Sequence, residues 1–139
     1  MDISDRKQVE NTLREKEEQL RILTDALPVC ISYIDKNERY QFVNKTYEIW
    51  WKKNREDIYG KTVKEILGKD AYRVVEDKIK QVLSGLNINY EAEIPYENAG
   101  KRYISAALVP DFDENHQVRG YYALITDISE HKKVELTLR

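Results

Sequence analysis

The chain has 139 residues, enough for one domain, with a net charge of −2 and interleaved acids and bases. Neither a membrane span of ~20 apolar residues nor a signal peptide is present, and the basic run at 52–55 is too short for a nucleic-acid-binding face. Cys30 is the only cysteine, which excludes an internal disulfide and favours a cytoplasmic location. We therefore expect no nucleic-acid contact and no direct membrane contact.

Residues 4–26 are predicted to form a helix that Ser4 or Asp5 can cap and that Pro28 ends. Its apolar residues are spaced alternately four and three residues apart if Lys16 occupies one position of the apolar seam. This period is typical of a coiled coil. The seam predicts a homodimer through Val9, Leu13, Leu20, Leu23 and Leu27. An ordinary amphipathic helix lying on its own domain is the alternative.

Two strands are predicted next, at residues 30–35 and 40–43, around a polar turn. Asn44 is a good N-cap for a short helix that carries two tryptophans. Residues 54–67 predict two brief helical turns hinged at Gly60, and residues 70–83 have the apolar spacing of an amphipathic helix. The middle of the chain is thus a block of short helices.

The rest of the chain is predicted to form three strands, at residues 88–96, 102–109 and 118–126, with a polar connection at 111–117. The last two are apolar on both faces, so both faces need cover. The middle helices can cover one face, and the N-terminal helix or a partner subunit the other. The predicted fold class is α+β, a five-stranded antiparallel sheet with short helices on one face and an N-terminal amphipathic helix.

Several motifs, in this order, resemble a PAS domain. Asp35 ends the first strand and Asn44 follows the second, as in the family's opening pattern. Residues 55–62 end in Gly-Lys-Thr before the next helix, like the corresponding PAS segment. Val109-Pro110, Gly120 and then Asp127-Ile128-Ser129 resemble its closing pattern. The resemblance covers about residues 20 to 131.

A repeat at the two ends agrees with this resemblance. Residues 2–14 and 127–139 share residue type at nine of thirteen positions, a distance too long for a solenoid repeat. PAS domains often stand in tandem, joined by helices. We expect a linker helix at 1–24, a PAS domain at 25–127 and the start of an exit helix at 128–139, with neighbouring PAS and output domains in a longer protein.

The same resemblance implies a signal-coupling corner and an internal pocket. Asp127 can accept hydrogen bonds at the sheet edge and Ser129 can cap the exit helix, although a stop-turn without signalling content is the alternative. The implied ligand-binding residues are Ser32, Ile34, Val43, Tyr47, Trp51, Ile104, Ala106, Leu108, Tyr121, Ala123 and Ile125. A filled core that binds no ligand remains equally open.

Familiar PAS cofactors fit the sequence poorly. The long helix at 70–83 contains no histidine for haem, and Cys30 is in the first strand rather than where a flavin- or thioester-linked cysteine would lie. Non-covalent flavin stays open, and the cofactor stays unknown. Residues 111–122 resemble a calcium loop, but His116 and Tyr122 stand where Gly and Glu are needed, so we expect no metal.

No catalytic arrangement is evident, so we expect no enzymatic activity. The sequence lacks a glycine-rich phosphate loop, and Glu91 and Glu93 are predicted on an exposed strand face where neither pKa would rise. The expected function is a PAS sensor module of a bacterial signalling protein, such as a sensor histidine kinase of a two-component system or a cyclic-dinucleotide enzyme. A ligand-free dimerisation spacer is the alternative.

Overall fold

A computed structural model describes residues 3–132 of the chain. Its elements, in chain order, are α1 (Ile3–Asp25), β1 (Cys30–Asp35), β2 (Tyr40–Val43), α2 (Lys45–Trp51), α3 (Arg55–Ile58), α4 (Val63–Leu67), α5 (Lys69–Leu83), β3 (Ile88–Tyr96), β4 (Gly100–Phe112) and β5 (Val118–Asp127). The α+β fold predicted from the sequence is confirmed.

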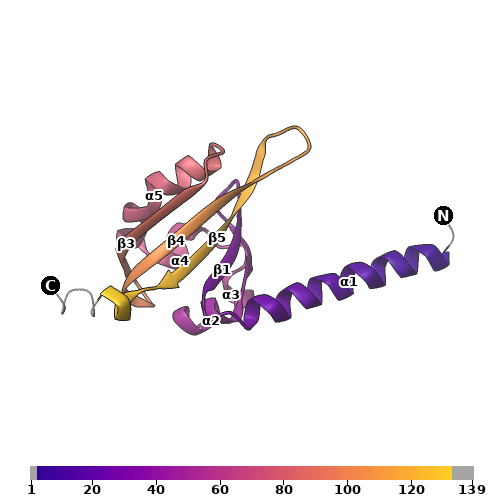
Figure 1. Ribbon diagram of the computed structural model, residues 1–139, viewed down its shortest axis with the longest axis horizontal. Coiled ribbons are helices and arrows are strands. Elements are labelled where there is room, and N and C mark those ends of the chain that lie inside the picture. The colour runs from indigo at the N-terminus through magenta and orange to yellow at the C-terminus, as the bar shows by residue number, and fades with distance from the viewer. Residues whose placement is uncertain (1–2, 133–139) are drawn as a thin grey trace.

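The five strands form one antiparallel sheet in the order β2-β1-β5-β4-β3. The first and last strands of the chain are therefore neighbours, and Ser32 of β1 lies opposite Ala123 of β5. The helices α2–α5 lie against one face of this sheet (Figure 1). This arrangement makes a cup whose interior lies between the sheet and the short helices.

Local signals in the sequence account for the helix boundaries. The Asn44 side chain accepts a hydrogen bond from the backbone N–H of Tyr47 and caps α2, as predicted. Thr62 caps α4 in the same way. Gly68 joins α4 to α5 at φ +91°, and a Cβ there would lie 2.6 Å from the Cβ of Glu97. Only glycine fits this junction without displacing the β3–β4 turn.

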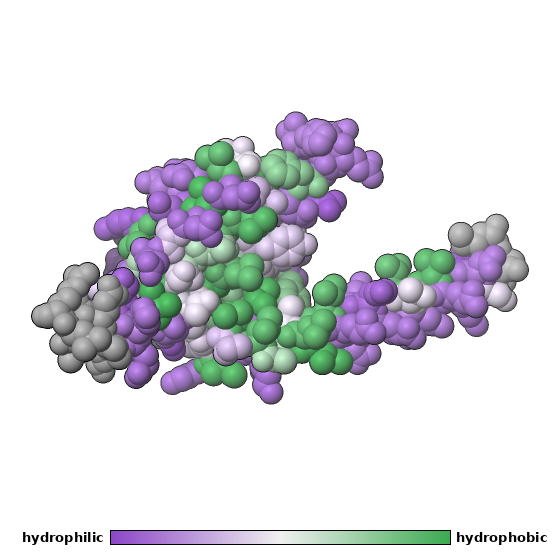
Figure 2. All heavy atoms as spheres, in the orientation of Figure 1, coloured by the Kyte–Doolittle hydropathy of each residue, from purple (hydrophilic) through white to green (hydrophobic). Residues whose placement is uncertain are grey.

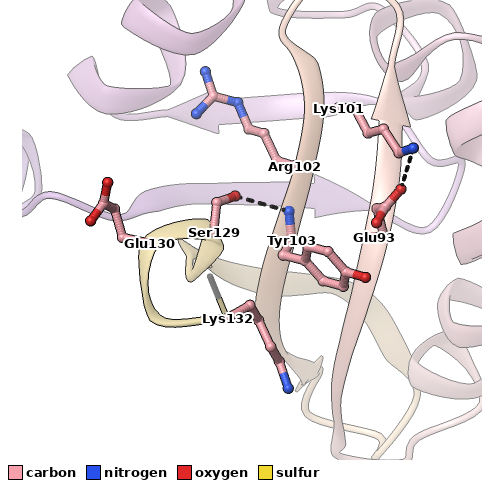
Figure 3. Close-up of a pocket in the computed structure, with 7 residues that line it drawn as sticks. All are labelled: Glu93, Lys101, Arg102, Tyr103, Ser129, Glu130 and Lys132. Atoms are coloured by element: carbon pink, nitrogen blue, oxygen red, sulfur yellow. Dashed lines mark hydrogen bonds and ion pairs between the residues drawn. The ribbon is translucent and has the colours of Figure 1, made fainter. Parts of the chain in front are cut away.

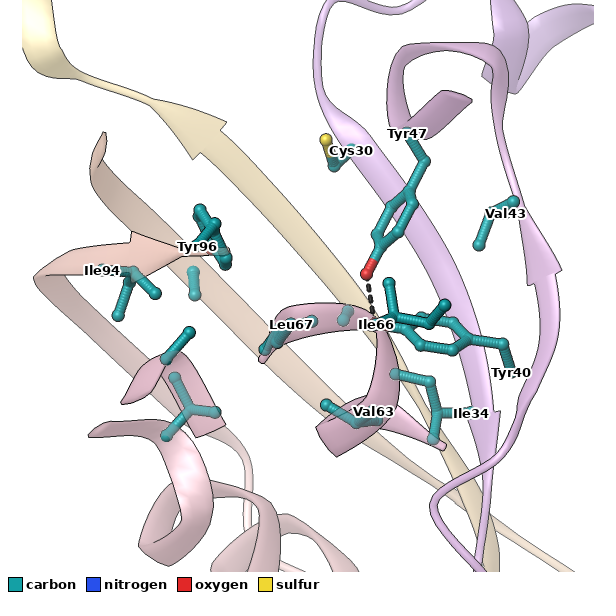
Figure 4. Close-up of a cluster of buried hydrophobic side chains, with 14 of the residues drawn as sticks. Cys30, Ile34, Tyr40, Val43, Tyr47, Val63, Ile66, Leu67, Ile94 and Tyr96 are labelled. Carbon is teal, nitrogen blue, oxygen red and sulfur yellow. Dashed lines mark hydrogen bonds between the residues drawn. The ribbon is translucent and has the colours of Figure 1, made fainter. Parts of the chain in front are cut away.

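The core lies between the inner face of the sheet and the helices that cover it (Figure 4). Ile79 and Val82 of α5 pack there with Ile104 of β4, and all three are at most 3% exposed. Trp50 and Trp51 of α2 close the end of the cup nearest the two linkers. The sheet and the helices thus share one hydrophobic core.

The N-terminal helix differs from one alternative that its sequence allowed. It extends away from the sheet and contacts the domain only near its C-terminal end, so it does not lie on its own domain (Figure 1). Its apolar side chains are exposed, as are several on the outer sheet face (Figure 2). The exposed fraction of the five predicted seam residues, Val9, Leu13, Leu20, Leu23 and Leu27, is 46–64%.

The end of α1 also differs slightly from the prediction. The helix ends at Asp25, because the Asp25 side chain turns to α2 and α3 and accepts bonds from the Lys45 N–H and the Arg55 guanidinium. Leu27, one of the five predicted seam residues, lies beyond the helix. The predicted seam residues within the helix are Val9, Leu13, Leu20 and Leu23.

The hairpin between β4 and β5 is longer than predicted. β4 continues to Phe112, because Pro110 and Asp111 still pair with Tyr121 and Gly120 across the ladder. The connection shrinks to residues 113–117, where the Asp113 carboxylate accepts from two backbone N–H groups. Asp113 thus organises a tight polar turn.

The outer face of the sheet has no cover within residues 3–132. Val109, Tyr122 and Leu124 are 40–46% exposed on that face, and Tyr122 packs edge-on against Tyr33. The N-terminal helix is not the cover, which leaves a partner subunit as the remaining alternative from the sequence. Over the same residues, no helix has the length and apolar character needed to cross a bilayer.

Candidate functional site

The interior of the cup contains a cavity of about 30 Å³. Its walls come from both layers of the fold and consist of Ser32, Ile34, Tyr40, Tyr47, Val63, Leu67, Val75, Ile79, Tyr90, Tyr96, Leu108, Tyr121, Ala123 and Ile125. Typical small-molecule pockets measure roughly 300–1,000 Å³, whereas one water needs only about 10–15 Å³ of such space. The cavity thus accommodates one or two water-sized molecules in this conformation.

The lining is uncharged but contains several hydroxyl groups. The side chains of Ser32, Tyr90, Tyr96 and Tyr121 make no hydrogen bond to any residue between 3 and 132. In that part of the chain, no side-chain nitrogen or oxygen is both sealed from solvent and unpaired. Ser32 and Tyr121 are only 1% exposed, so their hydroxyls meet the free space of the cavity. These groups can form hydrogen bonds with a small guest.

Two buried tyrosines form one wall of the cavity. The hydroxyls of Tyr40 and Tyr47 are hydrogen-bonded to each other (Figure 4), and both side chains are 1% exposed. Burial raises the pKa of Tyr40, Tyr47 and Tyr121 above the ordinary tyrosine value, because a phenolate would lose its hydration. Burial raises the pKa of Tyr90 to about 12. The tyrosines of the cavity are therefore neutral at physiological pH.

Seven of the eleven sequence-predicted pocket residues line this cavity, namely Ser32, Ile34, Tyr47, Leu108, Tyr121, Ala123 and Ile125. The other four, Val43, Trp51, Ile104 and Ala106, are buried in the core around it. Trp51 stacks on Tyr47 with ring centroids 4.2 Å apart, and its indole N–H donates to the carbonyl of Ile66 at 3.1 Å. Trp51 is thus occupied in packing the core rather than open for stacking on a flavin.

Sequence reasoning missed seven lining residues, Tyr40, Val63, Leu67, Val75, Ile79, Tyr90 and Tyr96. A signal existed for four of them. Strand alternation places Tyr90 and Tyr96 on the inner face of β3, and helical spacing places Val75 and Ile79 on the apolar face of α5. No comparable signal exists for Val63 and Leu67. Their positions depend on how α4 and α5 pack over the sheet.

The single cysteine is part of the same core. Cys30 is 1% exposed at the start of β1 and faces the helices (Figure 4). Burial raises the pKa of its thiol well above the ordinary value, so it remains a neutral thiol. No cluster of three or more potential metal ligands occurs among the residues that the structure describes.

A second feature lies where β5 ends, and we call it the exit corner: Asp127 and Ser129 with Arg102 and Tyr103 of β4. The Arg102 Nη1 atom lies 2.6 Å from Asp127 Oδ2, and the Ser129 N–H donates to Asp127 Oδ1 at 2.9 Å. The Tyr103 N–H donates to the Ser129 hydroxyl at 3.1 Å (Figure 3). Both Asp127 and Ser129 are therefore bonded to β4.

The charge of Asp127 is stabilised in this corner. Partial burial opposes ionisation, but the bonds from Ser129 and the Arg102 guanidinium together hold the pKa of Asp127 below its ordinary value. The sequence predicts Ser129 as the cap of the exit helix. In the structure Ser129 is the first residue of that helix, its hydroxyl accepts from the Tyr103 N–H, and the Asp127 carboxylate accepts from the Ser129 N–H.

Beyond the corner, residues 129–132 form the first turn of the exit helix. A hollow of about 330 Å³ lies beside this turn, between it and the edge of β3 and β4 (Figure 3). Mostly polar side chains line it, including Glu93 and Lys101, which form an ion pair at 2.6 Å. The rest of the predicted exit linker, residues 133–139, lies outside the described residues.

Most of the chain matches one family of known proteins. The sequence profile of the family described as PAS fold matches residues 24–133. The chain belongs to the PAS fold family. No curated protein matches the chain.

Solved PAS structures share the fold at low sequence identity. A PAS domain from Colwellia psychrerythraea has a TM-score of 0.69 at 18% identity, over 81% of this chain and 97% of that one. A sensory box sensor histidine kinase from Vibrio cholerae has a TM-score of 0.63 at 17% identity, over 86% and 97%. The N-terminal domain of a diguanylate cyclase with a PAS/PAC sensor from Marinobacter aquaeolei has a TM-score of 0.60 at 13% identity, over 75% and 98%.

Proposed function

We propose that this PAS domain is a cytoplasmic sensor module of a larger bacterial signalling protein, and that a small uncharged guest in its cavity changes the state of the flanking helices. The observation that carries the proposal is the set of unpaired hydroxyls, including those of Ser32 and Tyr121, inside an otherwise apolar cavity. Buried polar groups normally have partners, so such a set favours a hydrogen-bonding occupant.

The chemistry of the lining selects the class of guest. A charged molecule would lose its hydration without meeting an opposite charge, because neutral side chains alone line the cavity. A molecule larger than one or two waters also requires the walls to move. A guest can shift the domain only by the difference between its affinities for the two arrangements. We therefore expect guests that are small, neutral and able to form hydrogen bonds.

The output belongs to neighbouring domains of the parent protein. The names of two structural neighbours, a sensor histidine kinase and a diguanylate cyclase with a PAS/PAC sensor, favour these two kinds of output. The exposed apolar seam of α1 favours a parallel coiled-coil homodimer as the assembly that carries the signal.

Native mass spectrometry of the purified full chain, with a thermal-shift screen of neutral and charged metabolites, tests sensing. We expect a retained neutral guest or a shift of several degrees with neutral compounds, since binding to the native state raises its stability. The variant Ala123→Phe, which puts a large ring into the cavity wall, should abolish binding. Absence of any guest and of any shift across the panel would contradict the proposal.

A second candidate is a ligand-free dimerisation spacer. The observation in its favour is the small volume of the cavity, about 30 Å³. The side chains of five tyrosines line the cavity and leave little space inside it. The same screen separates the two candidates, because a spacer gives neither a retained guest nor a shift while remaining dimeric.

A further inference from the structure

The short helix α2 touches both linkers of the domain. On the N-terminal side, the Asp25 carboxylate at the end of α1 accepts from the Lys45 N–H at 2.8 Å, at the first residue of α2. The Arg55 guanidinium bonds both Asp25, at 3.1 Å, and Glu48 of α2, at 2.8 Å. The side chains of Asp25, Glu48 and Arg55 are 16–24% exposed, so water screens these contacts less than those of a surface pair.

The other end of α2 reaches the exit corner. The Arg102 guanidinium carbon lies 4.2 Å from the centroid of the Trp50 ring, within the range of a cation–π contact. The same guanidinium pairs with Asp127, and its Nε donates to the carbonyl of Ala99 at 2.9 Å. Arginine alone can use its face and its edge in this way at once. Arg102 therefore connects Trp50 of α2 directly to the residue that starts the exit.

Between these two contacts α2 is held as a rigid piece. Tyr47, Trp50 and Trp51 are all buried, and successive rings stack from Tyr47 to Trp51 to Trp50. The exit turn is held differently, because polar bonds tie it to β4 and a large hollow lies beside it. Segments held mainly by a few solvent-accessible hydrogen bonds open more easily than packed ones.

We propose that α2 couples α1 directly to the exit corner, with Trp50 and Arg102 as the joint, and that this route does not require a guest in the cavity. A movement of the preceding linker would shift α2, loosen the contact between Trp50 and Arg102, and free Asp127 and Ser129 to leave β4. The inference rests on the proposed relay role of the flanking helices. It also adds a second input, from the preceding domain, to the one that the cavity provides.

A hydrogen-exchange cycle on the full chain without added ligand tests this coupling. The readout is the exchange of the Ile128 and Ser129 amides, which bond to Tyr103 O and to Asp127, relative to a core amide such as Leu108. Asp25→Ala should speed exchange at the corner about fivefold or more, the lower end of typical site-to-site coupling. Glu18→Ala is the matched control, since Glu18 pairs with Arg21 on exposed α1 and has no other ion pair within residues 3–132.

The joint is tested by repeating the comparison in a Trp50→Leu background. There the Asp25→Ala change should produce no further acceleration at Ile128 and Ser129. If Trp50→Leu prevents folding, Arg102→Gln serves the same purpose, because the Arg102 side chain is 28% exposed and is not part of the buried core cluster. The proposal would be overturned if Asp25→Ala accelerated exchange at Ile128 and Ser129 as much in the Trp50→Leu or Arg102→Gln background as in the wild-type chain. It would also be overturned if Asp25→Ala had no effect on this exchange in the wild-type chain.

The test is independent of sensing. If the chain retains a guest but Asp25→Ala does not change exchange at the exit corner, the sensor function is still supported. Only the proposed route through α2 is then excluded. If Asp25→Ala changes exchange at the exit corner but no guest is found, the route through α2 is supported. The ligand-free dimerisation spacer is then the favoured function of the domain.

Discussion

At the scale of single residues, the pairing of polar atoms inside the cup decides what each side chain can do. Tyr40 and Tyr47 satisfy each other, and both are fully within the core. Tyr121 has the same burial but no partner among the described residues. The first pair is a structural contact, whereas the unpaired hydroxyl is a candidate contact for a guest.

The Tyr40–Tyr47 pair can be measured by removing one hydroxyl at a time. Tyr40→Phe or Tyr47→Phe should each lower the free energy of unfolding by about 1–3 kcal/mol, because the remaining buried hydroxyl loses its partner. The double variant should lose less than the sum. Urea denaturation checks this, with Tyr103→Phe on the exposed outer face as a control that changes stability by at most about 0.5 kcal/mol. Strictly additive losses would contradict the pairing.

At the scale of elements, one buried amide binds four backbone groups and so joins α1, β1 and α2. Asn44 is 0% exposed, and its oxygen accepts from the N–H groups of Ile31 and Tyr47. Its nitrogen donates to the carbonyls of Thr24 and Val29, at 2.7 and 2.9 Å. The residue that caps α2 thus also fixes the end of α1 and the start of β1.

Asn44→Ala should therefore cost more than the loss of an ordinary cap. We expect a decrease of about 2–4 kcal/mol in the free energy of unfolding, the sum of a cap and of buried backbone groups left unpaired. Thr62→Ala removes only the cap of α4 and should cost about 0.5–2 kcal/mol. Equal losses in chemical denaturation would show that Asn44 acts as a cap alone.

At the scale of the whole molecule, two apolar surfaces lack cover within the described chain, the seam of α1 and the outer face of the sheet. The seam extends away from the domain, so a second copy can reach it without disturbing the cup (Figure 1). This geometry favours association through α1.

Leu20→Asp or Leu23→Asp should convert the proposed α1 dimer to a monomer in sedimentation velocity, because a carboxylate buried in a coiled-coil seam would lose its hydration. Ile22→Asp is the matched control, since Ile22 is 58% exposed on the same helix but off the seam. Dimers that survive both seam substitutions would place the contact elsewhere, with the outer sheet face as the first candidate.

Local patterns in the amino-acid sequence predict the order and type of the elements and the cap of α2. Strand alternation predicts that Tyr90 and Ile94 lie on the same face of their strand, and Asn44 predicts the start of α2. Both predictions are possible because these signals depend only on residues near one another in the chain. The resemblance of Asp127-Ile128-Ser129 to the closing pattern of the family also indicated the exit corner. The strand alternation and the helix cap follow from local backbone geometry.

Which distant side chains meet depends on how the elements pack in three dimensions. Trp50 and Arg102 are far apart in the sequence, and no periodicity links them, yet they share one contact at 4.2 Å. The volume of the cavity was equally hidden, because it is the small remainder after side chains from the sheet and from three helices have packed together. Such a remainder depends on every wall at once, which no local pattern can encode.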